Sequence, residues 1–157
     1  MTFIFSTMTK RLKEKQKNNY IKTMNIIYKE TKDLNPKDLQ DLFLSVEWSS
    51  GHYPEKLAIA MQNSSTVYTA WDEDKLVGLI NVLDDNIMTA YIHYLLINPK
   101  FQGKGIGKNL VNYVKAKYKD YLRIVLIAYD KEAPFYQNLG FEIGDEKLPM
   151  FITSLWT

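Results

Sequence analysis

The amino-acid sequence predicts an α/β (α+β) domain with a mixed, largely antiparallel central sheet and helices on both faces. Three β-type runs, at residues 66–71, 76–83 and 87–97, are joined by polar turns at 72–75 and 84–86, a pattern that indicates an antiparallel meander. Helical periodicity lies before and after this meander. Because a sheet with apolar faces must bury them, the helices are expected to cover it.

Two helices are expected before the meander, after a short β-type run at residues 24–29. Asn35-Pro36 marks the first helix start, because proline is favoured in the first turn. Apolar residues then recur at helical spacing at Leu39, Leu42, Phe43 and Val46. Pro54 opens a second short helix on which Leu57, Ala58 and Met61 share one face.

The second half of the chain alternates helix and strand. A helix is expected from Ile106, with a core-facing stripe that continues through Leu110 and Val114. Residues 123–129 form a continuous apolar run, which predicts a strand covered on both faces. A short helix is expected at 130–139, with Gly140 at its C′ position. Closing strands are expected at 141–143 and 150–156.

Composition excludes several classes of function. The chain of 157 residues has no cysteine, which excludes disulfides, thiolate metal sites and cysteine catalysis. Its two histidines, His52 and His93, lack the spacing of a metalloprotease motif, so we expect no metal site. No apolar run approaches the roughly 20 residues that a membrane helix needs, and a cytoplasmic protein without a membrane partner is expected.

Charge divides the chain into two parts. Residues 1–23 hold six lysine or arginine residues and one glutamate, whereas the remainder holds 14 basic and 17 acidic residues. We therefore expect residues 1–23 to be a basic N-terminal extension, either disordered or weakly helical, and residues 24–157 to be the folded domain. A mildly acidic domain argues against nucleic acid as a partner.

The glycine-rich segment Gln102-Gly103-Lys104-Gly105-Ile106-Gly107-Lys108 carries the strongest functional signal. It follows a strand that ends at Ile97-Asn98-Pro99 and opens an amphipathic helix. Glycines let a ligand approach the backbone, and a helix start presents unpaired N–H groups and a positive dipole end, so the segment predicts a phosphate site. A P-loop would need Gly at 102 and Ser or Thr at 109, and a dinucleotide fingerprint would need Gly or Ala at 108, so both fail.

The segment matches a third pattern, Gln/Arg-x-x-Gly-x-Gly/Ala, at Gln102, Gly105 and Gly107. Downstream, residues 133–141 (Ala-Pro-Phe-Tyr-Gln-Asn-Leu-Gly-Phe) contain a Phe-Tyr…Gly-Phe helix at the expected distance. In both motifs and element order, residues 24–157 resemble the GNAT (GCN5-related) N-acetyltransferases. The resemblance implies the GNAT acyl-CoA N-acyltransferase fold and acetyl-CoA as co-substrate, without a metal.

A narrower resemblance concerns Glu47-Trp48-Ser49-Ser50 and Pro54-Glu55-Lys56-Leu57. These segments are similar to a subgroup that contains plant serotonin N-acetyltransferase-like proteins and bacterial relatives. That subgroup often has an Asp on the third meander strand where this chain has Tyr94. The resemblance therefore implies neither an Asp base at this point nor an aromatic amine as substrate.

The resemblance implies the residues of the site. The expected cofactor-binding residues are Leu96, Ile97, Gln102, Gly103, Lys104, Gly105, Ile106, Gly107, Lys108, Ala133 and Tyr136. Backbone N–H groups around Leu96 and Ile97 would polarise the acetyl carbonyl while an amine attacks it directly. Tyr136 is the expected catalytic acid for the leaving thiolate, and Tyr94 a second catalytic candidate, with ordinary packing as the alternative for both.

Other candidates have plainer interpretations. His93 alternates with Tyr94 along the strand, so only one of them should face a given side. Glu47, Asp84 and Asp85 could act as bases, although Asp84 and Asp85 lie in a turn and are expected to be solvated. The predicted function is N-acetylation of a primary amine, on a small molecule, peptide or protein, by a monomer or homodimer. The alternative is a non-catalytic acyl-CoA sensor with the same fold.

Overall fold

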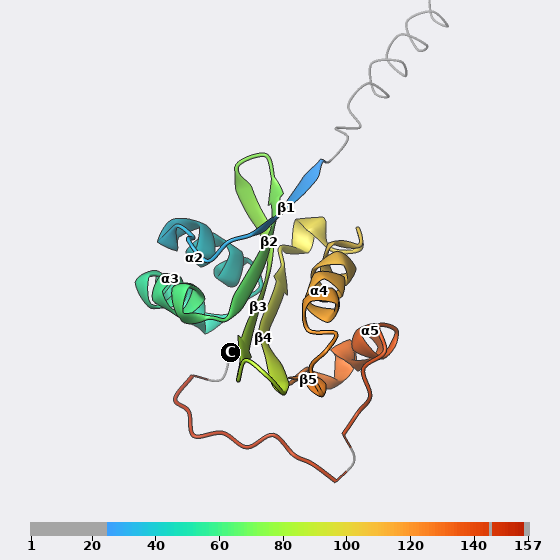
Figure 1. Cartoon of the computed structure of the whole chain (residues 1–157). Helices are drawn as coiled ribbons and strands as arrows, with labels where there is room; N and C mark the ends of the chain where they lie inside the picture. Colours follow the sequence, from blue (N-terminus) through green and yellow to red (C-terminus); the bar gives the residue numbers. More distant parts are fainter. Residues whose placement is uncertain (1–24, 145, 156–157) are drawn as a thin grey trace, which may run out of the picture.

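In the computed structural model of the protein, the described residues are 25–144 and 146–155 (Figure 1). The predicted N-terminal extension, residues 1–23, lies outside them. The sheet has the order β1-β2-β3-β4-β5. Its first three pairings are antiparallel and the β4–β5 pairing is parallel, which confirms a mixed, largely antiparallel sheet.

The chain up to residue 97 supplies four strands, two α-helices and one 3-10 helix. β1 spans Ile26–Glu30, α2 Pro36–Ser45, the 3-10 helix η1 Ser49–His52 and α3 Pro54–Asn63. The meander follows as β2 (Thr66–Asp72), β3 (Lys75–Asp84) and β4 (Thr89–Ile97). β4 begins two residues later than expected because Asp85 Oδ1 accepts hydrogen bonds from the backbone N–H groups of Ile87, Met88 and Thr89, which extends the turn.

The predicted helix start at Asn35 is confirmed and has a clear local cause. The Asn35 side chain accepts a hydrogen bond from Lys37 N at 2.8 Å, and Pro36 occupies the first helical position. α2 and α3 then bury one face each against the sheet, with Leu39, Leu42, Phe43, Leu57 and Met61 in a common core.

The opposite face of the sheet is covered by the second half of the chain (Figure 1). The short helix η2 spans Pro99–Phe101, α4 Ile106–Lys117, β5 Arg123–Leu126, η3 Asp130–Glu132 and α5 Ala133–Gln137. The predicted stripe on α4 is buried against the sheet at Ile106, Leu110 and Val114. Gly140 has φ 88°, in agreement with its expected place after the last helix.

β5 is shorter and more exposed than its apolar sequence predicts. It ends at Leu126 instead of Tyr129, and its residues alternate between exposed and half-buried. Its two faces are therefore not both covered, and pairing with β4 stops at Ile92↔Leu126. A continuous apolar run shows that a strand can be buried, but its neighbours decide whether it is.

The expected closing strands are wrong. Residues 141–143 and 150–155 have no strand assignment, and residue 156 is outside the described part. They follow an extended path outside the sheet (Figure 1), with Ile143, Met150 and Ile152 exposed. β propensity alone does not form a strand, because its N–H and C=O groups need an adjacent edge to pair with.

Candidate active site

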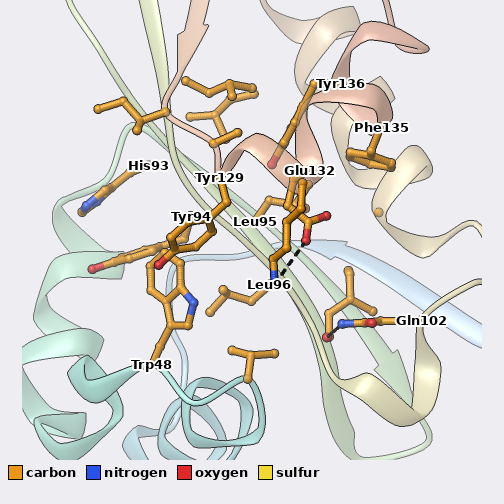
Figure 2. Close-up of a pocket in the computed structure, with 18 of the residues that line it drawn as sticks. Trp48, His93, Tyr94, Leu95, Leu96, Gln102, Tyr129, Glu132, Phe135 and Tyr136 are labelled. Atoms are coloured by element: carbon orange, nitrogen blue, oxygen red, sulfur yellow. Dashed lines mark hydrogen bonds and ion pairs between the residues drawn. The ribbon is translucent and has the colours of Figure 1, made fainter. Parts of the chain in front are cut away.

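The candidate site lies where β4 and β5 separate. The two strands pair from Thr89↔Arg123 to Ile92↔Leu126 and not beyond. A cavity of about 1300 Å³ is lined by the second half of β4, the segment after β5, the start of α4 and residues of α5 (Figure 2). The gap between two neighbouring strands therefore gives access to backbone groups that a continuous sheet would hide.

The glycine-rich loop forms one end of this cavity. Gly103 and Gly105 have φ 72° and 80°, in the left-handed region that favours glycine. Apart from chain neighbours, no heavy atom lies within 4 Å of a Cβ built at either position, so the backbone faces open space. Gly105 is the N-cap of α4 and provides no side-chain cap. The first N–H groups of α4 are thus free for an anion, as a pyrophosphate requires.

Gln102 and Gly107 hold the loop close to its neighbours. Gln102 Nε2 donates a hydrogen bond to the carbonyl oxygen of Ile97 at 3.0 Å. A Cβ on Gly107 would lie 3.4 Å from Phe135 Cζ, an ordinary van der Waals distance, so Gly107 lies directly beside the Phe135 ring of α5. Lys108, in the first turn of α4, also lines the cavity and adds positive charge beside the N-terminus of this helix.

The backbone of β4 supplies donors to the cavity. Tyr94 N donates to Asn81 Oδ1 and Asn98 N donates to Val77 O, so both point toward β3. Because N–H direction alternates along a strand, Leu96 N–H also faces β3. The amides of Leu95 and Ile97 face the open side. The structure therefore directs the N–H of Ile97 into the cavity as expected, but that of Leu95 instead of Leu96.

A β-bulge in β4 changes which side chains reach the cavity. Asn81 pairs with Tyr94 and Val82 with Ile92, so His93 has no partner on β3. His93 and Tyr94 both line the cavity, and their ring centroids are 4.0 Å apart. The expectation that only one of them faces a given side is wrong, because the extra residue interrupts the period of two.

Tyr94 belongs to an aromatic wall. Its ring makes edge contacts with Phe43 at 5.0 Å and with Trp48 at 5.3 Å between centroids. Burial raises the pKa of the Tyr94 hydroxyl above its usual value. Tyr94 therefore carries its proton at neutral pH, and it can donate a hydrogen bond but cannot act as a base there.

Tyr136 lies on the other wall, with Trp48 and Tyr94 across the cavity (Figure 2). Its ring packs against Phe135 at 5.0 Å and Phe141 at 5.8 Å between centroids. Burial, and to a smaller extent the carboxylate of Glu132, raise the pKa of Tyr136 to about 12. The Tyr136 hydroxyl is therefore protonated at neutral pH and is available as a hydrogen-bond donor.

Two further properties hold for the described residues. None of the groupings of His, Cys, Asp and Glu within 25–144 and 146–155 has the three or more members that could hold a metal ion. Over the same ranges, no helix has the length and apolar character needed to cross a membrane.

Comparison with known proteins shows which family has this combination of glycine-rich loop, separated strands and helix α5. The sequence model of the acetyltransferase (GNAT) domain matches residues 30–148. The chain belongs to the GNAT acetyltransferase family.

Similar GNAT proteins are found in plants and bacteria. The chain is 33% identical over 143 residues to the chloroplastic GCN5-related N-acetyltransferase 2 of Arabidopsis thaliana, with 77% of this chain and 55% of that protein covered. It is 30% identical over 123 residues to an uncharacterized ycf52-like N-acetyltransferase of Prochlorococcus marinus, with 74% and 68% covered. The chain therefore spans little more than half the length of the Arabidopsis relative.

The structural comparison confirms the fold. A GNAT family acetyltransferase of Streptococcus pneumoniae superposes with a TM-score of 0.72 at 27% identity, over 83% of this chain and 99% of that protein. The predicted GNAT acyl-CoA N-acyltransferase fold is therefore confirmed.

Most of the expected GNAT site residues meet at one cavity. Those that line it are Tyr94, Leu96, Ile97, Gln102, Gly103, Gly105, Ile106, Gly107, Lys108 and Tyr136. Lys104 and Ala133 do not line it, and Lys104 Nζ instead donates to Lys100 O at 3.0 Å. Asp84 and Asp85 are also outside the cavity; Asp84 accepts a hydrogen bond from the Tyr118 hydroxyl at 2.7 Å.

Several lining residues of this GNAT site have no assigned role in the sequence-based prediction: Trp48, Ser50, Leu95, Tyr129 and Glu132. Ser50 Oγ is buried beside Tyr94, and its hydrogen bond with the Tyr94 hydroxyl partly offsets the rise in the pKa of Tyr94 that burial causes. Trp48 and Ser50 lie in the segment that resembles the plant subgroup, so that segment carried a signal for this wall of the cavity. Leu95, Tyr129 and Glu132 follow ordinary β or turn patterns, which gave no indication of the gap between strands.

Proposed function

We propose that this GNAT protein transfers the acetyl group of acetyl-CoA to a primary amine by direct attack. The observation that carries the proposal is the continuity of one cavity from the glycine-rich loop, past the open backbone of β4, to Tyr136. An anion site at one end and a protonated phenol further along suit a ligand with a pyrophosphate and a thioester.

The residues fit acetyl-CoA in separate roles. The backbone of Gly103, Gly105 and Gly107, with Lys108, would hold the pyrophosphate. The amides of Leu95 and Ile97 would donate hydrogen bonds to the acetyl carbonyl oxygen as negative charge develops on it. The Tyr136 hydroxyl would donate its proton to the leaving thiolate. Acetyl-CoA supplies the activated acyl group, and the chain supplies position, polarisation and protons.

The acceptor would enter from the wall that holds Trp48 and Tyr94. Glu47, Asp130 and Glu132 also line the cavity. Acidic side chains at the mouth of a site raise the local concentration of cations, and an amine is protonated at neutral pH. These charges support an amine as acceptor, whether on a small molecule, a peptide or a protein.

The proposed anion site is tested with two substitutions that differ in charge alone. Asn tolerates the left-handed conformation of Gly105 better than most residues and has nearly the shape of Asp. We expect Gly105→Asn to keep measurable acetyl-CoA binding by calorimetry and Gly105→Asp to lose at least tenfold more affinity, because its carboxylate repels the pyrophosphate. Equal affinities in two folded variants would refute a phosphate site here.

Catalysis is tested separately from binding. Wild-type protein is assayed for acetyl-CoA consumption over a panel of small amines, polyamines and lysine peptides. Turnover with one acceptor class supports the proposal, whereas binding of acetyl-CoA without turnover of any amine favours the acyl-CoA sensor.

A further inference from the structure

We propose that the protein acetylates lysine side chains of its own N-terminal extension, residues 1–23, an inference that rests on the acetyl transfer proposed above. The extension is rich in lysine, and the cavity beyond the glycine-rich loop is acidic and aromatic. The chain leaves the extension at β1, whose first residues lie at the end of the sheet where β4 stops. The extension therefore brings amine, charge and a tether to the site.

Charge favours the encounter of the extension with the cavity. Residues 1–23 hold six basic residues and one glutamate, a net charge of +5, whereas residues 24–157 hold 14 basic and 17 acidic residues, a net charge of −3. The charged residues that line the cavity are Glu47, Asp130 and Glu132 against Lys108 and Lys131. Lys108 lies at the start of α4 beside the loop, and Lys131 pairs with Glu132 at 3.9 Å. Away from the loop the cavity is therefore net negative, and it attracts a lysine ammonium group.

The wall that holds Trp48 and Tyr94 suits a lysine side chain. Both residues are half-buried and line the cavity, and their ring centroids are 5.3 Å apart. A lysine has a long apolar stem and a compact ammonium head, so the stem packs against aromatic rings while the head is attracted to their faces. The carboxylate of Glu47, an exposed residue beside Trp48, adds a partner for the head. The extension supplies such side chains at Lys10, Lys13, Lys15, Lys17 and Lys22.

Strand pairing fixes the distance from the start of β1 to the reacting groups. One row of paired residues crosses the sheet from β1 to β4: Tyr28, Ala70, Gly78 and Ile97. The three strand spacings of this row correspond to about 14 Å. Because β1 and β4 run in opposite directions, Ile26 and Leu95 lie two residues on opposite sides of the row, roughly 13 Å apart along the strands. Ile26 is therefore about 20 Å from the open amide of Leu95.

The length of the tether separates lysines that reach the site from one that does not. The four distal lysines, which lie 9 to 16 residues before Ile26, are Lys10, Lys13, Lys15 and Lys17. A fully extended backbone spans about 3.3 Å per residue, so it carries them up to about 30–53 Å from Ile26, beyond the 20 Å separation. Lys22 lies four residues before Ile26, which allows about 13 Å and falls short. The straight line also crosses the sheet, so the path around it is longer.

The transfer to lysine balances in protons and electrons. The ammonium group loses one proton to solvent, and the neutral nitrogen forms the C–N bond at the thioester carbonyl carbon. The C–S bond breaks with its electron pair leaving on sulfur. The thiolate takes the Tyr136 proton, and the second nitrogen proton restores the phenol, which leaves acetyl-lysine and CoA thiol. Each transfer removes one positive charge, so an extension acetylated at all four distal lysines has a net charge of +1 and leaves the cavity to other amines.

The test follows the acetyl group into the full chain. The full-length protein is incubated with isotopically labelled acetyl-CoA, and its peptides are analysed by mass spectrometry at short times. We expect the four distal lysines to gain label at least about tenfold faster than Lys22 and than Lys119, which is exposed on the folded domain. Spontaneous acetylation by acetyl-CoA would not separate these exposed amines by tether length. Because the transfer is intramolecular, the rate per molecule should stay constant over about a hundredfold dilution.

Two variants separate transfer within one chain from transfer between chains. The combined Lys10→Arg, Lys13→Arg, Lys15→Arg and Lys17→Arg variant keeps the charge of the extension and should take up about tenfold less label. The Gly105→Asp chain, which is expected to lose acetyl-CoA affinity, is mixed with wild type and distinguished from it by mass. The extension of the Gly105→Asp chain should stay unlabelled, because each site acts on its own extension.

The outcomes distinguish this inference from the proposed function. A wild type that acetylates an amine of the panel, but labels the four distal lysines no faster than Lys22 or Lys119, overturns the inference and leaves the acetyl transfer in place. A rate per molecule that rises with protein concentration, or label on the Gly105→Asp chain in the mixture, also overturns it. A wild type that acetylates neither its extension nor any amine of the panel overturns the proposed function and this inference together.

Discussion

Tyr136 stands between Phe135 and Phe141 on the cavity wall, and this packing determines its protonation state. A free phenol has a pKa near 10, whereas burial and Glu132 raise that of Tyr136 to about 12. The hydroxyl therefore stays protonated throughout the range in which an acetyltransferase would be assayed. A motif predicted this residue from the sequence, but its protonation follows from the neighbours that the fold supplies.

We expect Tyr136→Phe to lower kcat by about 10²–10⁴-fold, because only the hydroxyl is removed and the ring packing stays. Acetyl-CoA affinity should be unchanged. Both quantities are measured at pH 7.5, and kcat is measured with the same amine for wild type and variant. Since the pKa of Tyr136 is raised to about 12, its hydroxyl keeps its proton below about pH 11. Ionisation of Tyr136 should therefore not lower wild-type kcat below that pH. Tyr53→Phe, at an exposed tyrosine that does not line the cavity, is the control and should retain activity. Wild-type kcat in the Tyr136→Phe variant, with chemistry rate-limiting, would remove Tyr136 as the acid.

At the scale of elements, β4 carries most of the site. Its first half pairs on both sides, and its second half pairs only with β3. The bulge at His93 lies where the β5 pairing ends, so a single strand provides both a structural edge and an open row of backbone donors. Asn81 on the neighbouring strand is the residue that makes this local departure stable.

We expect Asn81→Leu to destabilise the protein by about 1–3 kcal/mol, because Tyr94 N–H loses its acceptor in a buried site. The free energy of unfolding is measured by urea denaturation. The same change at Asn112, which is exposed on α4, is the control and should stay within about 0.5 kcal/mol of wild type. A fully stable Asn81→Leu variant would mean that the bulge does not depend on this side chain.

The whole molecule is two helical layers on one sheet, with α2 and α3 on one face and α4 on the other (Figure 1). The cavity opens between these layers at the edge that β5 leaves incomplete. The loop, the bulge and α5 come from separate parts of the chain, and the sheet brings them together.

Residues 1–23 precede β1, which begins at Ile26. We expect deletion of residues 2–23 to leave Tm and the rate of acetyl transfer unchanged, as thermal unfolding and the amine assay would measure. Deletion through residue 30 is the control and should destabilise the fold, because it removes the pairing of β1 with β2. A lower Tm on the shorter deletion would show that the basic segment packs on the domain.

The sequence by itself determined the elements with local causes. Asn35-Pro36 starts α2, the periodic apolar residues of α4 bury its face, and glycine permits the positive φ values found at Gly103 and Gly105. The family motifs also predicted Gln102, Gly105, Gly107 and Tyr136 as site residues, and all four line the cavity. These signals depend on a residue and its near neighbours in the chain, and they can be read without knowing the fold.

Tertiary structure alone decided how the strands continue. The apolar runs at 123–129 and 150–155 predicted longer and additional strands, but a strand requires a neighbour that accepts its hydrogen bonds. The bulge that puts His93 and Tyr94 on one wall depends on Asn81, which is 13 residues from Tyr94 in sequence. Backbone pairing between distant segments sets strand ends, bulges and amide direction. Such pairing leaves no mark in the local composition of either segment.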